Sequence, residues 1–196
     1  MIKGKIPIWL IAVSILMPTS FSALATTATN VAIPHISGYF AATADEAKWI
    51  VTSYMVANAC LIMLSGWLEQ LFGRKQLIKI CIAVFTLGAL ICTLAPSLNI
   101  MVIGRFVQGV GGGPMTPISQ TVLLSAFPPN KKGLAMSLFG FAVMVCAILG
   151  PSFGGFLVDN FNWHYIYSIN IPVGIISFIL VTKFISDTKP KQKTNN

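Results

Sequence analysis

The sequence predicts an all-α integral membrane protein with six transmembrane helices. Hydrophobic residues make up 55% of the chain and charged residues only 9%, whereas about a quarter of the residues in an average soluble protein are charged. A helix that crosses the hydrocarbon core needs about 20 predominantly apolar residues, because no water is present there to satisfy the backbone. Six stretches meet this requirement, at about 8–33, 49–68, 77–95, 100–125, 133–158 and 165–185.

Short connections separate these spans, which predicts antiparallel neighbouring helices. We expect residues 1–185 to form one transmembrane bundle without a soluble domain. Residues 186–196 are polar and lysine-rich, and such a composition predicts a disordered basic tail in the cytoplasm. The expected connections lie at 37–48, around Gly73, and at 96–99, 128–132 and 159–164.

Basic residues alternate between the loops, with 11 of the 13 on one side. Because basic residues concentrate in cytoplasmic loops, we expect a multi-pass protein of the cell inner (plasma) membrane with both termini in the cytoplasm. The net charge of +8 then reflects topology and indicates no nucleic-acid partner. The residues on that side are Lys3, Lys5, Arg74, Lys75, Lys79, Lys131, Lys132, Lys183, Lys189, Lys191 and Lys193, against Lys48 on the other side and Arg105 within the membrane.

A cleaved signal peptide is the alternative interpretation of the N-terminus. Two lysines precede an apolar run, and Ala23-Leu24-Ala25 resembles a cleavage site. The apolar run continues to Pro34, however, and cleavage would leave five spans and break the alternation of charge. We therefore expect an uncleaved first span.

The sequence indicates no enzyme, cofactor or metal site. The cysteines fall inside predicted spans and are interpreted as small packing residues, and the two histidines are expected at the outward interface. No nucleophile, base or metal-binding constellation is recognisable. The residues concerned are Cys60, Cys81, Cys92, Cys146, His35 and His164.

Glycine and proline concentrate at 109–114 in the fourth span and 150–155 in the fifth. One interpretation is a packing face, because small residues let helices approach closely in lipid. The other is a flexible segment near a substrate path, as in transporters. Both interpretations stay open for the fourth span.

Five motifs occur in order along the spans, namely residues 24–34, 66–75, Arg105 with Gln108 and Gly109, 150–155, and 163–174. Together they resemble the major facilitator superfamily, specifically its fourteen-span drug:proton antiporter branch. The resemblance covers about residues 24–174. It implies the N-terminal half of a transporter that exports amphipathic or cationic drug-like compounds in exchange for protons, with a periplasmic adaptor protein as a candidate partner.

Three positions depart from the pattern of this branch. Ala25 stands where an aspartate is usual, Gln70 replaces an aspartate with Glu69 just before it, and Cys146 replaces a glycine. Glu69 is positioned to reach Arg74, but no acidic residue lies in the middle of any predicted span. Proton coupling needs a group that gains and loses a proton. Either that group lies in a second half, or transport is uncoupled, or the chain moves nothing.

Arg105 is the one ionisable residue predicted deep in a span, with Gln108 and Gly109 beside it. An arginine there costs about 2.5–3.5 kcal/mol, so it should face a cavity or the bundle interior and respond to a proton or a cationic substrate. The alternative is that its side chain extends to the outer interface. Arginine keeps its proton and cannot carry it.

Two further groups are expected to gate transport. One group closes the cytoplasmic face and comprises the loop residues Gly66, Glu69, Gly73, Arg74 and Lys75. The alternative interpretation of the basic pair Arg74 and Lys75 is a topological anchor alone. In the fifth span the resemblance favours a functional role, and the proline there permits a bend. Its residues are Gly150, Pro151, Gly154 and Gly155.

Substrate contacts are expected from polar, aromatic and methionine side chains within the spans, although packing is the commoner role of such residues. The leading hypothesis is a drug efflux permease represented by its N-terminal half. The alternative is a non-transporting half that assembles with or regulates another membrane protein. The candidates for the cavity are Asn30, Tyr54, Asn58, Met115 and Gln120, and by residue type also Met63, Met136 and Met144.

Overall fold

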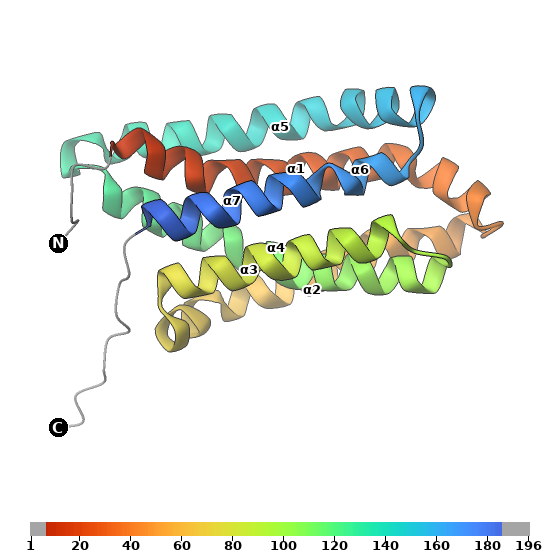
Figure 1. The fold of residues 1–196 in the computed structure, drawn as a ribbon, viewed down its shortest axis with the longest axis horizontal. Helices are drawn as coiled ribbons and strands as arrows, with labels where there is room; N and C mark the ends of the chain where they lie inside the picture. Colours follow the sequence, from red (N-terminus) through yellow and green to blue (C-terminus); the bar gives the residue numbers. More distant parts are fainter. Residues whose placement is uncertain (1–6, 186–196) are drawn as a thin grey trace.

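The computed structural model describes residues 7–185 as a bundle of long helices that run roughly along one common axis (Figure 1). The expectations for Lys3, Lys5 and the tail at 186–196 lie outside the described residues. The elements are α1 (Ile8–Tyr39), α2 (Ala44–Phe72), α3 (Arg74–Thr93), α4 (Leu98–Ala126), the short 3₁₀ helix η1 (Pro129–Lys131), α5 (Lys132–Asn160), α6 (His164–Ser168) and α7 (Asn170–Phe184).

Helices that are distant in the sequence pack against one another. The closest packing joins α3 with α4, α2 with α4, and α1 with α5, and α7 lies against α3 and α1. The first three-helix unit (α1 to α3) and the second (α4 to α7) therefore exchange partners, since α1 packs on α5 and α4 on α2. This exchange fixes α4 between α2 and α3.

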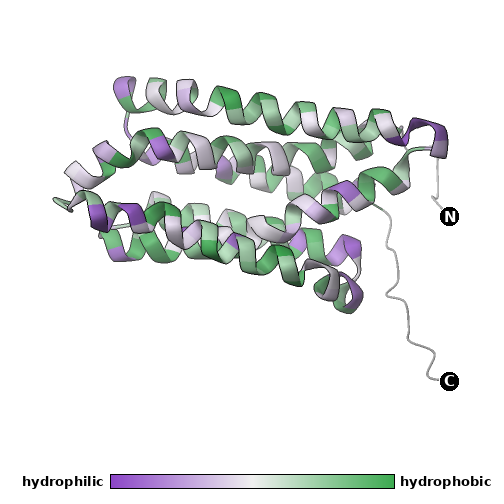
Figure 2. Ribbon diagram, turned by 180° about the vertical axis from the view of Figure 1, so that it is seen from behind, coloured by the Kyte–Doolittle hydropathy of each residue, from purple (hydrophilic) through white to green (hydrophobic). Residues whose placement is uncertain are grey.

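Hydropathy along the bundle matches that of a membrane-spanning protein. Hydrophilic residues gather mainly toward the two ends, with apolar residues between them (Figure 2). Five helical stretches are long and apolar enough to cross a membrane, and α6 with α7 counts as one of them. α4 is not among the five because Arg105, Gln108 and its many glycines lower its hydropathy, but it is the helix most enclosed by others. The six-helix, all-α prediction is confirmed.

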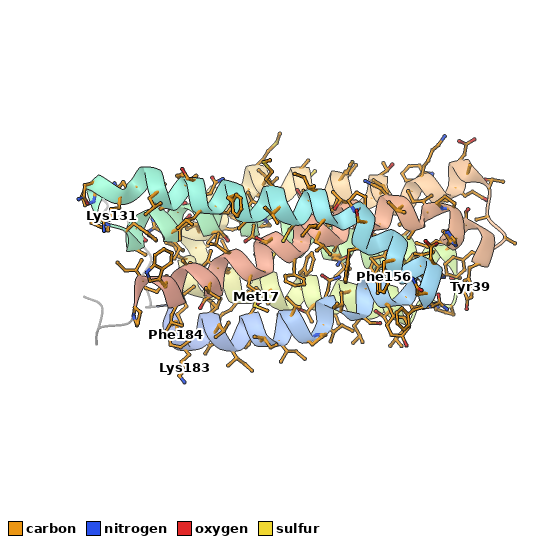
Figure 3. All side chains as sticks on the ribbon, turned by 90° about the horizontal axis from the view of Figure 1, so that it is seen from above. Met17, Tyr39, Lys131, Phe156, Lys183 and Phe184 are labelled. Carbon is orange, nitrogen blue, oxygen red and sulfur yellow. The ribbon has the colours of Figure 1, made fainter. Side chains whose placement is uncertain are left out.

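Basic side chains mark one end of the bundle. Lys131 and Lys183 lie at this end and Tyr39 at the opposite end (Figure 3). The connection between α2 and α3, which carries Arg74 and Lys75, is at the same end as the connection between α4 and α5. We call this the basic end.

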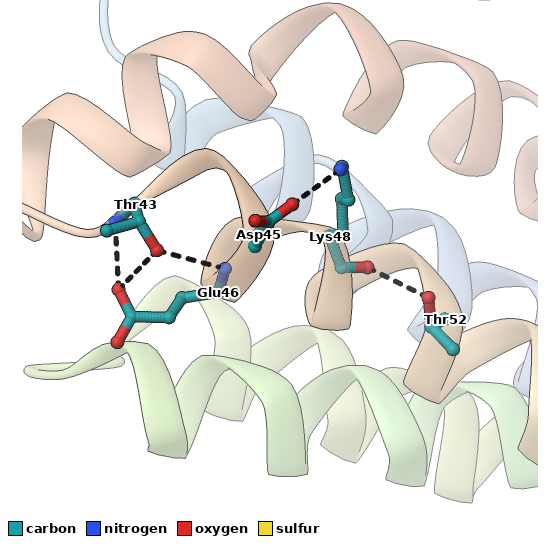
Figure 4. A network of polar contacts seen from close by, with 5 residues as sticks. All are labelled: Thr43, Asp45, Glu46, Lys48 and Thr52. Atoms are coloured by element: carbon teal, nitrogen blue, oxygen red, sulfur yellow. Dashed lines mark hydrogen bonds and ion pairs between the residues drawn. The ribbon is translucent and has the colours of Figure 1, made fainter.

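The connection between α1 and α2 is shorter than expected. α1 continues through Pro34 to Tyr39, so the irregular segment is residues 40–43 and not 37–48. A capping box starts α2, because the Thr43 hydroxyl accepts a hydrogen bond from the Glu46 backbone N–H (3.3 Å) and the Glu46 carboxylate accepts one from the Thr43 N–H (2.8 Å) (Figure 4). Hydrophobicity alone does not detect such polar helical turns.

The sixth span is one helical stretch, His164–Phe184, which a turn at Ile169 divides into α6 and α7. Ile169 keeps helical φ and ψ angles of −66° and −24°, and its N–H donates to the Tyr165 carbonyl at 3.2 Å. The Asn170 side-chain amide donates to the Ile166 carbonyl at 2.8 Å beside this turn. The span predicted at 165–185 therefore corresponds to α6 and α7 together.

Glycines of α4 allow its neighbours to approach at backbone distance. A Cβ at Gly109 would lie 2.5 Å from the Tyr54 carbonyl oxygen on α2, and one at Gly111 would lie 2.6 Å from the Cys81 carbonyl oxygen on α3. Successive glycines thus serve opposite neighbours. For 109–114 this geometry supports the packing interpretation.

We predict that Gly111→Ala destabilises the bundle, whereas Gly140→Ala does not. The added methyl at 111 overlaps the α3 backbone and should lower the free energy of unfolding by about 1–3 kcal/mol. Gly140 on α5 has no atom within 4 Å of a Cβ, so alanine there should be neutral or stabilising by about 0.5–1 kcal/mol. Denaturation in mixed detergent micelles measures both, and equal effects would refute this packing.

Candidate functional site

Arg105 is fully buried, at 0% exposure, inside the described bundle. Its Nε donates to the Ile50 carbonyl on α2 at 3.2 Å, and its Nη1 donates to the Gln108 side-chain oxygen at 2.8 Å. The side chain therefore points into the bundle and does not extend to the outer surface. Burial is possible because the glycines of α4 bring α2 close enough to exclude water.

Aromatic rings complete the surroundings of the guanidinium. Its Cζ lies 4.4 Å from the ring centroid of Tyr54 on α2 and 5.8 Å from that of Tyr167 on α6. The Tyr167 hydroxyl donates to the Thr29 hydroxyl at 3.1 Å, and the Thr29 hydroxyl donates to the Ala25 carbonyl at 2.7 Å. Contacts thus lead from the buried cation to the position where the resemblance expects an aspartate.

Neutral groups provide the compensation for this charge. Among residues 7–185, the ion pairs are Lys48 with Asp45 and Arg74 with Glu69, so no described carboxylate pairs with Arg105. Its Nη2 and the Gln108 Nε2 have no hydrogen-bond partner among the described residues. A buried cation held by dipoles and π faces alone is costly. It leaves a positive potential inside the bundle.

A cavity of about 380 Å³ lies next to this cluster, between α1, α2, α4 and α5. Tyr54 joins the two, because its ring faces Arg105 while its hydroxyl lies 3.2 Å from the Ser22 hydroxyl and accepts from the Asn58 amide at 3.4 Å. The volume is within the usual range for ligand sites, about 300–1,000 Å³. The cavity is lined by Thr19, Ser22, Ala23, Thr26, Thr27, Tyr54, Met55, Asn58, Gly112, Thr116, Val143 and Ala147.

Two of the expected cavity residues, Tyr54 and Asn58, line this cavity, and three do not. Met115 is buried in the core between α1, α3, α4 and α7, Asn30 is exposed, and Gln120 is half-buried elsewhere on α4. Met63 is 86% exposed on α2, also away from the cavity.

The hydroxyl residues of α1 were missed by the sequence analysis. Thr19, Ser22 and Thr26 follow one another at intervals of three and four residues, as residues on one face of a helix do, and Thr27 directly follows Thr26. That spacing in the first span was the available signal.

The loop motif at the basic end contains an ion pair. The Arg74 Nε lies 2.6 Å from the Glu69 Oε1, with side chains 31% and 24% exposed, so Glu69 does reach Arg74. Gly73 between the helices has φ 76° and ψ 156°, a conformation that essentially requires glycine. Gly66, expected to allow close approach, faces open space instead, and Lys75 is half-buried.

The glycines of the fifth-span motif contact α1. A Cβ at Gly154 would lie 2.8 Å from the Ala28 backbone, and one at Gly150 would overlap Thr27. Gly155 is looser, with Val31 at 3.9 Å, and Pro151 is exposed. α5 continues as one helix through Pro151.

We predict strong energetic coupling between Arg105 and Gln108. Arg105→Met leaves the Gln108 oxygen without its donor, and Gln108→Met removes an acceptor from the cation, so each should destabilise by about 1–3 kcal/mol. The double variant loses both groups together and should cost about 1–3 kcal/mol less than the sum. Arg105→Met combined with the exposed Thr182→Ala serves as the additive control. Additivity of the first pair would contradict the contact.

The sequence is similar to those of several known membrane transporters and resistance proteins. The chain is 39% identical over 173 residues to the probable multidrug resistance protein EmrY of Escherichia coli (strain K12). It is 35% identical over 173 residues to the multidrug export protein EmrB of the same strain, and 36% identical over 184 residues to the fatty acid resistance protein FarB of Neisseria gonorrhoeae. These matches cover 88%, 88% and 94% of this chain. They cover 34%, 34% and 36% of the relatives, so the chain spans about a third of their length.

Solved structures show the same fold at low sequence identity. The inward open xylose transporter XylE from E. coli matches with a TM-score of 0.80 at 16% identity, over 92% of this chain and 48% of that one. The POT family transporter PepTSo matches with a TM-score of 0.76 at 16% identity, over 94% and 39%. The profile of the Major Facilitator Superfamily matches residues 15–196. The chain belongs to the Major Facilitator Superfamily.

Proposed function

We propose that this chain is the N-terminal six-helix half of a multidrug exporter of the inner membrane, and that it supplies one wall of the substrate path. The superfamily consists of transporters and not of enzymes, and relatives at 35–39% identity carry multidrug resistance or export in their names. The observation that carries the proposal is the cavity of about 380 Å³ between α1, α2, α4 and α5.

The lining of the cavity suits amphipathic compounds. Hydroxyl groups on α1 and the Asn58 amide can make hydrogen bonds in several directions, while Met55 and Val143 provide apolar contact. Methionine adapts to varied apolar shapes. A site of this kind orients a ligand loosely, as broad specificity requires.

The charge beside the cavity favours neutral or anionic amphipathic substrates over cationic ones. Arg105 lies one aromatic ring away from the lining and has no carboxylate partner among residues 7–185. In a medium of low dielectric constant its field reaches the cavity with little screening. This preference differs from the cationic substrates expected from the resemblance, and FarB, a relative named for fatty acid resistance, supports it.

We place the basic end in the cytoplasm. Arg74, Lys75, Lys131, Lys132 and Lys183 gather there, and the positive-inside rule assigns such an end to the cytoplasmic face. The Glu69–Arg74 ion pair then belongs to the cytoplasmic connection between α2 and α3, where it would help to hold one conformation of the gate.

Proton coupling would need a carboxylate from outside the described residues. Ala25 is 1% exposed, and contacts through Thr29 and Tyr167 connect its backbone carbonyl with Arg105. The position therefore suits a proton-coupling carboxylate, whereas an alanine side chain cannot bind a proton. Protons and a periplasmic adaptor protein remain parts of the proposal for a complete transporter.

A non-transporting half is the second candidate, and the exposed faces of α2 and α5 favour it. These helices flank the cavity and present large apolar side chains outward, including Met63, Phe141 and Ile148. A second six-helix unit seated on these faces would enclose the cavity. The two candidates therefore share the cavity and differ in whether the chain moves its ligand.

We predict that Ala147→Trp abolishes ligand handling, whereas Ile176→Trp does not. Ala147 lines the cavity, whereas Ile176 is exposed on α7, away from the cavity and from the exposed faces of α2 and α5. In cells expressing the chain, energy-dependent efflux of an anionic fluorescent amphiphile should exceed that of ethidium, and a protonophore should collapse this efflux only where a carboxylate from outside residues 7–185 couples it to protons. Binding to the purified chain should weaken at least about tenfold, or 1.4 kcal/mol, in Ala147→Trp.

Absence of efflux with retained, Ala147-sensitive binding would favour the non-transporting half. Absence of both would refute the proposed function. Stronger handling of ethidium than of the anionic amphiphile would refute the charge preference alone.

We predict that Ala25→Asp makes ligand binding depend on pH, whereas the isosteric Ala25→Asn does not. Burial at this position disfavours the charged carboxylate, so the aspartate should hold a proton that its surroundings control. Proton uptake or release on ligand addition can be followed in weakly buffered detergent solution. Equal pH profiles for the two variants would show that position 25 is not connected to the site.

A further inference from the structure

A second cavity lies on the outside of the bundle, between α3 and α7, away from the proposed substrate path. It encloses about 460 Å³ and is almost entirely apolar. Its rim carries four exposed side chains, those of Leu87, Leu90, Ile175 and Ile179. Gly174, which has no side chain, forms part of its wall. We call it the α3–α7 groove. Its lining is Ile82, Ala83, Thr86, Leu87, Leu90, Ile171, Gly174, Ile175, Phe178 and Ile179.

The length of the groove matches one leaflet of a bilayer. On α3 it extends from Ile82 to Leu90, which is about 12 Å at 1.5 Å per residue. Half of a hydrocarbon core is about 15 Å thick. The groove runs along the helices toward the basic end, because α3 begins there at Arg74 and α7 ends there at Phe184. An acyl chain entering from that end would fit along it.

Two lysines stand one helical turn beyond the groove, at the basic end. Lys79 precedes Ile82 by three residues, and its Nζ lies 5.3 Å from the ring centroid of Phe178, which lines the groove. Lys183 follows Ile179 by four residues and is exposed, with its Nζ 5.7 Å from the ring centroid of Phe184. Each of the two helices that form the groove thus carries a lysine just beyond the groove, on the side of the basic end.

No carboxylate among the described residues neutralises these lysines. Of the acidic residues within 7–185, only Glu69 lies at the basic end, and it pairs with Arg74. Asp45, Glu46 and Asp159 lie in the turns at the opposite end. The groove therefore combines an apolar channel of leaflet length with a positive charge at one end that no carboxylate of residues 7–185 compensates.

From this combination we infer that the α3–α7 groove is a binding site for an anionic phospholipid. One acyl chain lies between Ile82 and Leu90, and the phosphate is held by Lys79 and Lys183. Charge complementarity selects an anionic headgroup over a zwitterionic one, since each lysine near a membrane surface contributes about a fivefold preference for anionic lipid. The inference does not depend on the proposed substrate path, because the groove shares no lining residue with that cavity.

Photo-crosslinking in vesicles tests the site. The full chain is reconstituted in phosphatidylcholine with a trace of phosphatidylglycerol or phosphatidylcholine that carries a diazirine on one acyl chain, and labelled peptides are mapped by mass spectrometry. We expect the phosphatidylglycerol probe to label the peptides of α3 and α7 at least about fivefold more than the phosphatidylcholine probe. Unlabelled phosphatidylglycerol should compete.

Variants separate the headgroup site from the acyl channel. Lys79→Gln/Lys183→Gln should reduce phosphatidylglycerol labelling to the phosphatidylcholine level, whereas Lys131→Gln/Lys132→Gln removes the same charge from exposed positions outside the groove and should not. Ala83→Phe fills the channel from an exposed position and should reduce labelling by both probes in the groove.

Several results would overturn the inference. Equal labelling by the two probes would mean ordinary boundary lipid, and labelling that maps to other helices would place the lipid elsewhere. Absence of labelling on α3 and α7 by both probes, with labelling on other helices, would mean that no lipid occupies the groove. The Lys131/Lys132 control could lose as much labelling as the Lys79/Lys183 variant. That result would show that general surface charge, and not the groove, selects the anionic lipid.

Discussion

The burial of Arg105 is the constraint on which the rest of this bundle depends. A guanidinium at 0% exposure must find its partners inside the protein, and it takes them from α2, α4 and α6. Tyr167 extends the contacts to Thr29 on α1. These contacts require backbone-distance packing, which Gly109 and Gly111 permit on two sides of α4. The one long helix that is not apolar enough to count as a candidate membrane span among residues 7–185 is thus also the most enclosed.

The same arrangement connects the packing of the bundle to the proposed substrate path. Tyr54 faces Arg105 with its ring and the cavity with its hydroxyl, so a ligand that moves this side chain also changes the surroundings of the cation. Because Arg105 has no described carboxylate partner, its charge acts on the cavity directly. In an alternating-access carrier, the conformation that gives this cation a better partner is stabilised. The partner would be the ligand or a group on the other half.

Hydrophobicity predicted the spans and the six-helix architecture, since apolar runs of this length have few alternatives in a bilayer. The position of Arg105 within an apolar span also indicated that its side chain should lie in the interior of the bundle. Polar local chemistry was harder to predict, because the Thr43–Glu46 capping box that starts α2 depends on individual hydrogen bonds. The cavity was predicted only at Tyr54 and Asn58. Met115 is core because α1, α3 and α7 converge on it, and sequence alone does not show that convergence.

Solvent exchange of the arginine side chains tests whether Arg105 is enclosed in the bundle. The chain contains only two arginines, Arg74 and Arg105, so arginine-specific ¹⁵N labelling gives two guanidinium signals, which Arg74→Lys assigns. Arg74 is partly exposed and serves as the internal reference. We expect the Arg105 Nε–H to exchange with deuterated solvent far more slowly than that of Arg74. Equally fast exchange of both would contradict a dry, enclosed Arg105.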